Sequence, residues 1–135
     1  MALRDAVARL QVHAGSLSGM KESPTDPPES ANQYPFAVTY VRGGSWHVES
    51  AGFSHALVTF ITEIHVNRQN LPTDVARVVG FFEGFMQKLL GDQTLNGNID
   101  TISTVDFEFG SMVYSGVETL GWRFIIGESK VTITS

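Results

Sequence analysis

The sequence predicts a single α+β domain over residues 1–135, with two main helices packed on one face of an antiparallel-rich mixed sheet. The length of 135 residues is that of one ordinary domain. Hydrophobic residues make up 42% of the chain and charged residues 17%, a balance typical of a folded core rather than of disorder. Helical and strand patterns do not alternate strictly along the chain, which disfavours a doubly wound parallel sheet.

The first predicted element is a helix over residues 2–13, where apolar residues recur with the period of one helix face: Leu3, Ala6, Val7 and Leu10. A long Pro/Ser-rich loop is predicted next, at residues 14–34, which hold three of the five prolines. Loops of this length are uncommon in compact domains and are usually functional or disordered. We therefore expect this loop to contact a partner or to become ordered on assembly, rather than to act as a passive linker.

A strand is predicted over residues 34–41, with alternate residues on one face: Phe36, Val38 and Tyr40. The Gly-Gly pair that follows is typical of a tight turn, so a hairpin connection is predicted at residues 42–45. Residues 46–50 would then form the returning strand.

The clearest strand pattern covers residues 57–66. One face of this strand is mainly apolar. The other face is mixed and carries both Glu63 and His65. Because it is mixed, we expect this second face to lie near water or near a neighbouring element.

A long helix is predicted over residues 72–90, with Pro72 in its first turn and Gly91 as its stop. Its apolar positions recur every three or four residues and include Val79 and Leu90. A polar loop follows at residues 92–100, where Asn-Gly marks a turn. The helix is therefore expected to bury a broad apolar stripe.

The C-terminal part of the chain predicts further strands, over residues 102–109 and 122–126. Residues 110–116 are expected to form a turn with a short strand, and residues 130–134 either continue the last strand or form a separate one. The aromatic side chains of this region, Phe107 and Phe109 among them, fall on apolar faces and are expected in the core.

Composition excludes several classes of function. The chain has no cysteine, so disulfide scaffolds, thiol catalysis and cysteine-ligated zinc are excluded. Its net charge is −5, and nine Lys and Arg residues spread along the chain do not form a basic surface for nucleic acid. No apolar run approaches the roughly 18 to 20 residues needed to cross a bilayer, so we expect no membrane partner.

Two groups of side chains could carry chemistry. Glu63 and His65 share a strand face, as an acid/base or metal site requires, although a polar surface is the commoner role of such a pair. Asp106 and Glu108 also share a face, as exposed strands often show. No phosphate-binding loop, dinucleotide turn or nucleophile elbow is present. We therefore expect that the protein is not an enzyme and that it has no catalytic residue, metal ligand or cofactor.

Three segments of the sequence together resemble those of a known protein family: residues 34–36 (YPF), 62–75 (TEIHVNRQNLPTDV) and 118–124 (ETLGWRF). In their order and spacing they resemble tail terminator (tail completion) proteins of long-tailed, siphovirus-type bacteriophages. The likeness covers about residues 34–126, with a similar helix before it. The loop at residues 14–34 matches no pattern of that family.

The resemblance implies a structural virion protein made in the host cytoplasm and located at the head-proximal end of the tail. Such proteins form a hexameric ring that caps the tail tube, ends its polymerisation and provides the attachment surface for the head. The implied partners are further copies of the chain, the tail tube protein and a head-completion (neck) protein. Genomic DNA would pass through the lumen without specific binding.

Several residues are candidates for contacts in such an assembly. The candidate interface residues lie in the long loop, at the predicted hairpin and on the mixed strand face: Pro24, Asp26, Pro27, Pro28, Arg42, Trp46, Glu63 and His65. Asp106 and Glu108 are candidate lumen acids, which would repel passing DNA.

Three other interpretations remain open from the residues. One is another neck protein that joins head to tail. A second is a small ligand-binding or enzymatic domain that uses Glu63 and His65. A third is a cellular adaptor domain that forms no ring.

Overall fold

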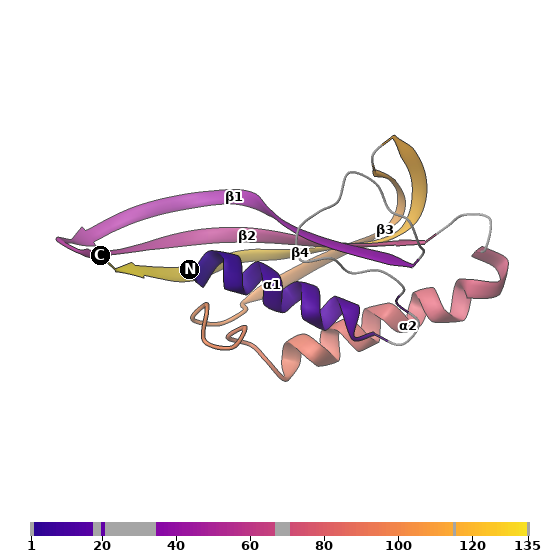
Figure 1. Cartoon of the computed structure of the whole chain (residues 1–135), viewed down its shortest axis with the longest axis horizontal. Coiled ribbons are helices and arrows are strands. Elements are labelled where there is room, and N and C mark those ends of the chain that lie inside the picture. The colour runs from indigo at the N-terminus through magenta and orange to yellow at the C-terminus, as the bar shows by residue number, and fades with distance from the viewer. Residues whose placement is uncertain (1, 18–19, 21–34, 67–70, 115, 135) are drawn as a thin grey trace.

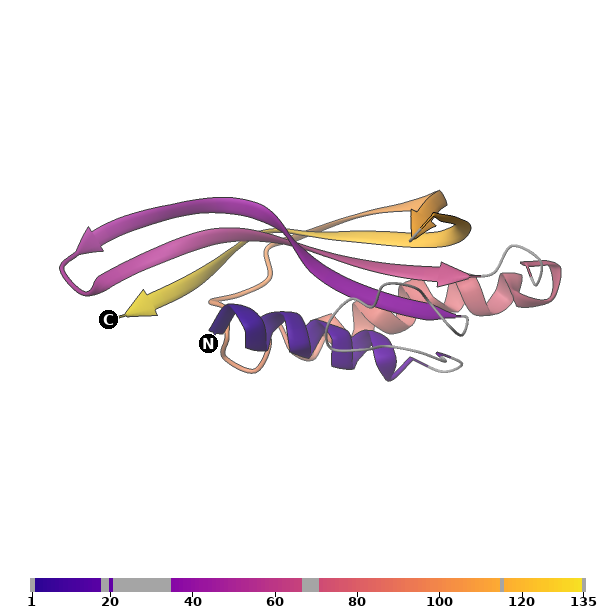
Figure 2. The same cartoon turned by 45° about the horizontal axis from the view of Figure 1, so that its top comes forward.

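The computed structural model describes residues 2–17, 20, 35–66, 71–114 and 116–134. The four strands form one sheet in the order β1-β2-β4-β3, and every neighbouring pair is antiparallel. Both helices lie on the same face of this sheet (Figure 1 and Figure 2). The predicted α+β domain is confirmed, although its described strands form a purely antiparallel sheet instead of a mixed one. The elements are α1 (Ala2–Gly15), β1 (Phe36–Ser50), β2 (Phe53–Val66), α2 (Leu71–Leu90), β3 (Thr104–Tyr114) and β4 (Val117–Thr134).

The hairpin turn predicted at Arg42–Ser45 is wrong. β1 continues through this segment to Ser50, and the chain reverses only at residues 51–52, where Gly52 has a φ of +76°. The register between β1 and β2 shifts between Val41 and Gly43, which marks a β-bulge. A Cβ atom on Gly44 would collide with the carbonyl oxygen of Leu57. The two glycines therefore serve a bulge and a close approach of two strands, not a turn.

The last strand is also longer than the sequence pattern indicates. β4 runs without a break through the two segments predicted at residues 122–126 and 130–134. Its irregularity is a register shift against β2, where Ile126 pairs with Phe60 but Ser129 pairs with Val58. β1, β2 and the end of β4 therefore extend as a long three-stranded ribbon past the helices (Figure 2).

The core lies between the helices and the sheet. The strand side chains that face the helices are fully buried there, among them Phe60, Ile64, Phe124 and Ile126. α2 faces them with Phe81, Phe85 and Leu89, whereas Val79 and Leu90 are exposed. The predicted stripe of α2 was therefore too wide, because the sheet and α1 cover only one side of this helix.

A carboxylate fixes α1 to the loop that follows α2. Asp92 Oδ2 accepts a hydrogen bond from Arg9 Nε at 2.6 Å and lies 2.7 Å from His13 Nε2. The backbone N–H of Asn96 donates to Asp92 Oδ1 at 2.9 Å. Burial opposes ionisation of Asp92, but these hydrogen bonds outweigh it and lower the pKa of the carboxyl to about 2. The ionised carboxylate thus holds α1 against the loop that follows α2.

We expect Asp92→Asn to lower the free energy of unfolding at pH 7 by about 2 kcal/mol. Because the folded-state pKa is depressed, this contribution is present above the ordinary value of 3.8 and is lost as the pH falls toward 2. The free energies of unfolding of the two proteins, measured by urea titration at pH values from 7 to 2, should therefore converge below pH 4. Asp100→Asn is the control, since Asp100 is exposed and lies 3.9 Å from Lys130. A constant difference between Asp92→Asn and the parent at every pH would contradict the prediction.

Candidate functional site

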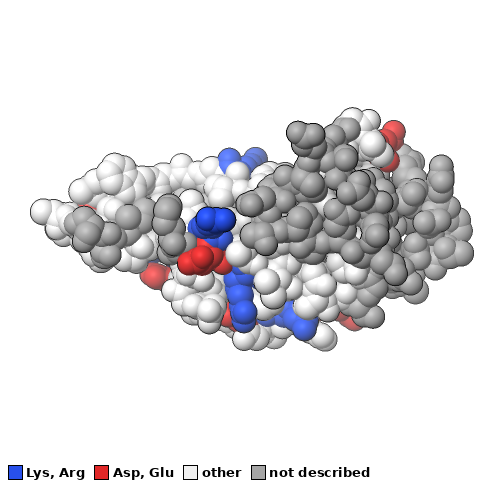
Figure 3. All heavy atoms as spheres, viewed as in Figure 1, with Lys and Arg blue, Asp and Glu red and all other residues white. Residues whose placement is uncertain are grey.

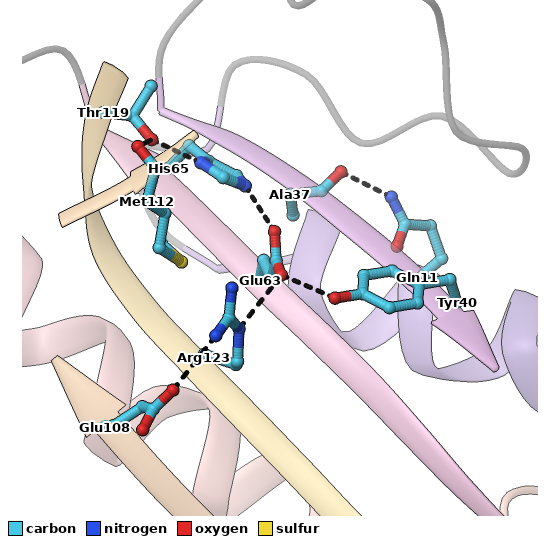
Figure 4. A network of polar contacts seen from close by, with 9 residues as sticks. All are labelled: Gln11, Ala37, Tyr40, Glu63, His65, Glu108, Met112, Thr119 and Arg123. Carbon is cyan, nitrogen blue, oxygen red and sulfur yellow. Dashed lines mark hydrogen bonds and ion pairs between the residues drawn. The ribbon is translucent and has the colours of Figure 1, made fainter. Parts of the chain in front are cut away.

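A network of polar side chains crosses all four strands on the sheet face opposite the two described helices, which we name the open face (Figure 4). At its centre, Glu63 Oε2 accepts hydrogen bonds from the Tyr40 hydroxyl at 2.7 Å and from Arg123 Nε at 3.1 Å. Glu63 Oε1 lies 2.8 Å from His65 Nε2, and His65 Nδ1 lies 2.6 Å from the Thr119 hydroxyl. The strands are therefore joined by side chains as well as by their backbones.

Strand register explains why these side chains meet. Glu63 pairs directly with Arg123 of β4, which in turn pairs with Glu108 of β3. The three charges thus form a row of alternating sign across the sheet, and Arg123 Nη1 donates to Glu108 Oε1 at 3.1 Å. His65 follows Glu63 by two residues and so shares its face.

The electrostatics of the network favour an ionised Glu63. Burial alone would raise the pKa of this carboxyl, but hydrogen bonds from His65 and Tyr40 and the charge of Arg123 hold its pKa below the ordinary value. Burial and the hydrogen bond to Glu63 raise the pKa of Tyr40 to about 12. At neutral pH, Tyr40 is therefore a neutral donor to a charged acceptor.

The closed geometry of this network argues for a structural role. His65 is fully buried, both of its ring nitrogens have partners, and the Glu63 side chain is only 7% exposed. The rings of Phe36 and Tyr114 lie over His65, with centroids 6.0 and 5.5 Å from its ring. Of the two surroundings expected for this strand face, water or a neighbouring element, its end has the second, because these rings cover it. A substrate or metal would have to displace existing hydrogen bonds to reach either residue.

No alternative centre for a metal emerges in the part of the chain that the structure describes. Among those residues, no three His, Asp or Glu side chains are grouped so that they could hold an ion. The described charges on the face seen in Figure 3 are few, with blue and red side chains next to one another. No separate basic surface is visible there.

The other candidate interface residues and the two candidate lumen acids divide into three groups. Arg42 and Trp46 are exposed on β1; Trp46 is 63% exposed and its indole N–H donates to the Ser54 hydroxyl at 2.9 Å. The side chains of Asp106 and Glu108 are exposed on the open face of β3. Four residues lie outside the described part of the chain: Pro24, Asp26, Pro27 and Pro28. Glu63 and His65, by contrast, lie in the interior rather than on a contact surface.

Sequence reasoning missed an exposed aromatic cluster beside the sheet edge. Phe107 and Phe109 were expected in the core, but they are 53% and 47% exposed. Their rings lie 6.1 and 5.0 Å from the ring of Trp122, and Phe82 of α2 lies 4.6 Å from Phe107. We name these four residues the β3 aromatic cluster. The expectation failed because β3 is an edge strand that α2 covers only in part, and alternation does not distinguish edge strands from central ones.

A second exposed apolar surface lies at the other end of the sheet order. We name residues 43–58, the end of β1 and the start of β2 on either side of their common turn, the β1–β2 arm. Trp46 and Val48 of this arm are more than 60% exposed. They pair with Ala56 and Ser54, which share the helix-side face of β2 with the core residue Val58. The arm and the aromatic cluster therefore present apolar side chains on the same side of the sheet, at opposite edges.

Comparison with known proteins adds no assignment. No model of a known protein family matches the chain, and no curated protein is significantly similar to it. No helix among the described residues is long and apolar enough to cross a membrane.

Proposed function

We propose that this chain is a structural virion protein of a long-tailed bacteriophage, which forms a ring of six copies on the end of the tail tube. The ring ends polymerisation of the tube and offers its other side to a head-completion (neck) protein. The proposal combines the resemblance of residues 34–126 to tail terminator proteins with the surfaces of the folded chain.

One observation carries the proposal: the chain exposes two different apolar surfaces at opposite edges of one sheet. Trp46 and Val48 project from one edge, and Phe107 and Phe109 from the other. Contacts between two different patches of the same chain are heterologous, and heterologous contacts generate rings when the rotation closes. A two-fold dimer would instead use one patch that is complementary to itself. The edges of this sheet therefore favour head-to-tail assembly.

The charge of the chain suits a passage for DNA that does not bind DNA. Six copies of a chain with a net charge of −5 would carry −30. We place Asp106 and Glu108, which are exposed on the open face, toward the lumen. There they would repel phosphates and let the duplex slide. A reconstruction of the ring with both carboxylates on its outer surface would contradict this placement.

The closed state of the Glu63–His65 pair gives the enzymatic alternative no support. Both side chains are occupied by partners within the chain. A network of this kind makes the four strands one rigid sheet, as a ring subunit requires.

Light scattering and negative-stain imaging test the proposal, with and without purified tail tubes. We expect six-fold rings, or a cap at one end of each tube, and tubes of limited length when the protein is present during polymerisation. A ring that binds the head side but never the tube would favour the head–tail joining role. A chain that stays monomeric and ignores the tubes would overturn the proposal.

A further inference from the structure

We propose that the contact between neighbouring copies is a strand pairing. In it, β3 of one copy lies antiparallel to the β1 strand of the β1–β2 arm of the next copy. This inference rests on the proposed self-assembly, but it is independent of what the ring caps. It joins the two exposed surfaces into one interface and makes the sheet continuous from copy to copy.

Strand direction is the first argument. Each of the three strand pairs in the order β1-β2-β4-β3 is antiparallel, so directions alternate and the two edge strands run in opposite directions. A second copy placed beside β3 in the same orientation therefore presents its β1 antiparallel to β3. Such a copy also keeps its helices on the same side of the joined sheet. The alternation of directions continues without a break, and it can be repeated around a ring.

The edges themselves are the second argument. Among the described strands, β1 and β3 each have a single neighbour, so each has a row of backbone donors and acceptors on its outer side. Natural edges are often protected by lysine, by proline, by other charged side chains or by bulges. β1 and β3 contain no lysine and no proline. β1 bulges between Val41 and Gly43 and between Val48 and Ser50, but from Gly43 to Val48 it pairs with β2 without a shift. Long edges without lysine or proline are suited to pairing with another chain.

Apolar side chains match across this pairing on the helix side. Trp46 and Val48 project there from the arm, and Phe107 and Phe109 project there from β3. In an antiparallel pairing with Trp46 opposite Phe107 or Phe109, these side chains become cross-strand neighbours. The β3 aromatic cluster would then extend into the next copy, and its exposed rings would be covered.

Polar side chains match on the open face in the same registers. When Trp46 lies opposite Phe107, His47 lies opposite Asp106; when Trp46 lies opposite Phe109, His47 lies opposite Glu108. His47 is exposed and stacks on His55 with ring centroids 5.1 Å apart, so its position on the arm is defined. An imidazole N–H opposite a carboxylate is a favourable cross-strand pair, whichever register is used. The two edges are thus complementary on both faces of the sheet.

The absence of cysteine allows a direct test by cross-linking. Directly opposite residues of an antiparallel pair have Cα atoms about 4.5 to 5.5 Å apart, within the range that a disulfide spans. We would make two double variants, His47→Cys with Glu108→Cys and His47→Cys with Asp106→Cys, one for each register. All three positions are exposed, and urea titration would confirm that each variant is folded. The three single variants are the matched controls.

Under mild oxidation, we expect one double variant to give a ladder of covalent oligomers on a denaturing gel. A mixture of the corresponding single variants should give only covalent dimers, and each single variant alone should give none. Cross-linked dimers from a single variant would indicate a two-fold contact and would overturn the inference. So would a lack of cross-links in both double variants while the parent protein forms rings.

The same experiment separates this inference from the proposed function. A covalent ladder together with rings that never cap tail tubes would support the strand pairing and overturn the tail role. Rings on tubes without any cross-link would support the tail role and overturn the pairing. Monomers without cross-links would overturn both.

Discussion

Replacing Glu63 with alanine should lower the free energy of unfolding by about 3 kcal/mol, because the partners of a buried charge are left without it. The carboxylate accepts hydrogen bonds from Tyr40 and Arg123 and lies 2.8 Å from His65 Nε2. His65 is fully buried, so water cannot replace the lost partner without opening the sheet. Urea unfolding followed by circular dichroism measures the loss.

Glu108→Ala is the matched control for this prediction. Glu108 binds the same guanidinium at 3.1 Å, but its side chain is 61% exposed, and we expect a change within about 0.5 kcal/mol. Equal losses for the two alanine variants would show that the buried network does not stabilise the fold.

The pH dependence of stability provides a second readout for Glu63. Its pKa is depressed in the folded state, so its contribution is present above the ordinary value of 4.5 and is lost as the pH falls below that value. The stability of Glu63→Ala should therefore approach that of the parent in acid. A gap between the two proteins that stays constant into acid would indicate that the lost contacts do not involve the charge.

The main elements of the fold could be predicted from the sequence, but their ends could not. Periodicity identified both helices and the segments that form all four strands. It failed where a glycine interrupts the pattern, because Gly43 and Gly127 look like turn residues whether the chain reverses or only bulges. Which of these happens depends on pairing with β2, and this pairing is a property of the folded sheet.

The candidate site shows the same limit. Alternation placed Glu63 and His65 on one face, but their partners Thr119 and Arg123 lie more than fifty residues away in sequence. Only the register of β2 against β4 brings these groups together. The exposure of Phe107 was missed for a related reason, since strand order and not local pattern decides which strand is an edge.

Replacing Gly121 with alanine should destabilise the protein by about 3 kcal/mol or more, through a collision in the middle of the sheet. A Cβ atom at Gly121 would meet the backbone carbonyl oxygen of Ile64, and backbone atoms of paired strands cannot rotate away as a side chain can. Gly121 pairs with His65, so a displaced β4 would also disturb the contact between Thr119 and His65. Urea unfolding and thermal unfolding measure the loss.

Gly110 is an almost ideal control, because it pairs directly with Gly121 across β3 and β4. Among the described residues other than Gly110 and its two chain neighbours, no atom lies within 4 Å of a Cβ placed on Gly110, which lines a hollow of about 270 Å³ on the open face. Gly110→Ala should therefore change the stability by less than about 1 kcal/mol, since alanine also restricts the unfolded chain. A similar large loss for both variants would point to a general intolerance of side chains at the end of this hairpin. A large loss for Gly121→Ala alone would locate the constraint where β4 lies against β2, the pairing on which the whole polar network depends.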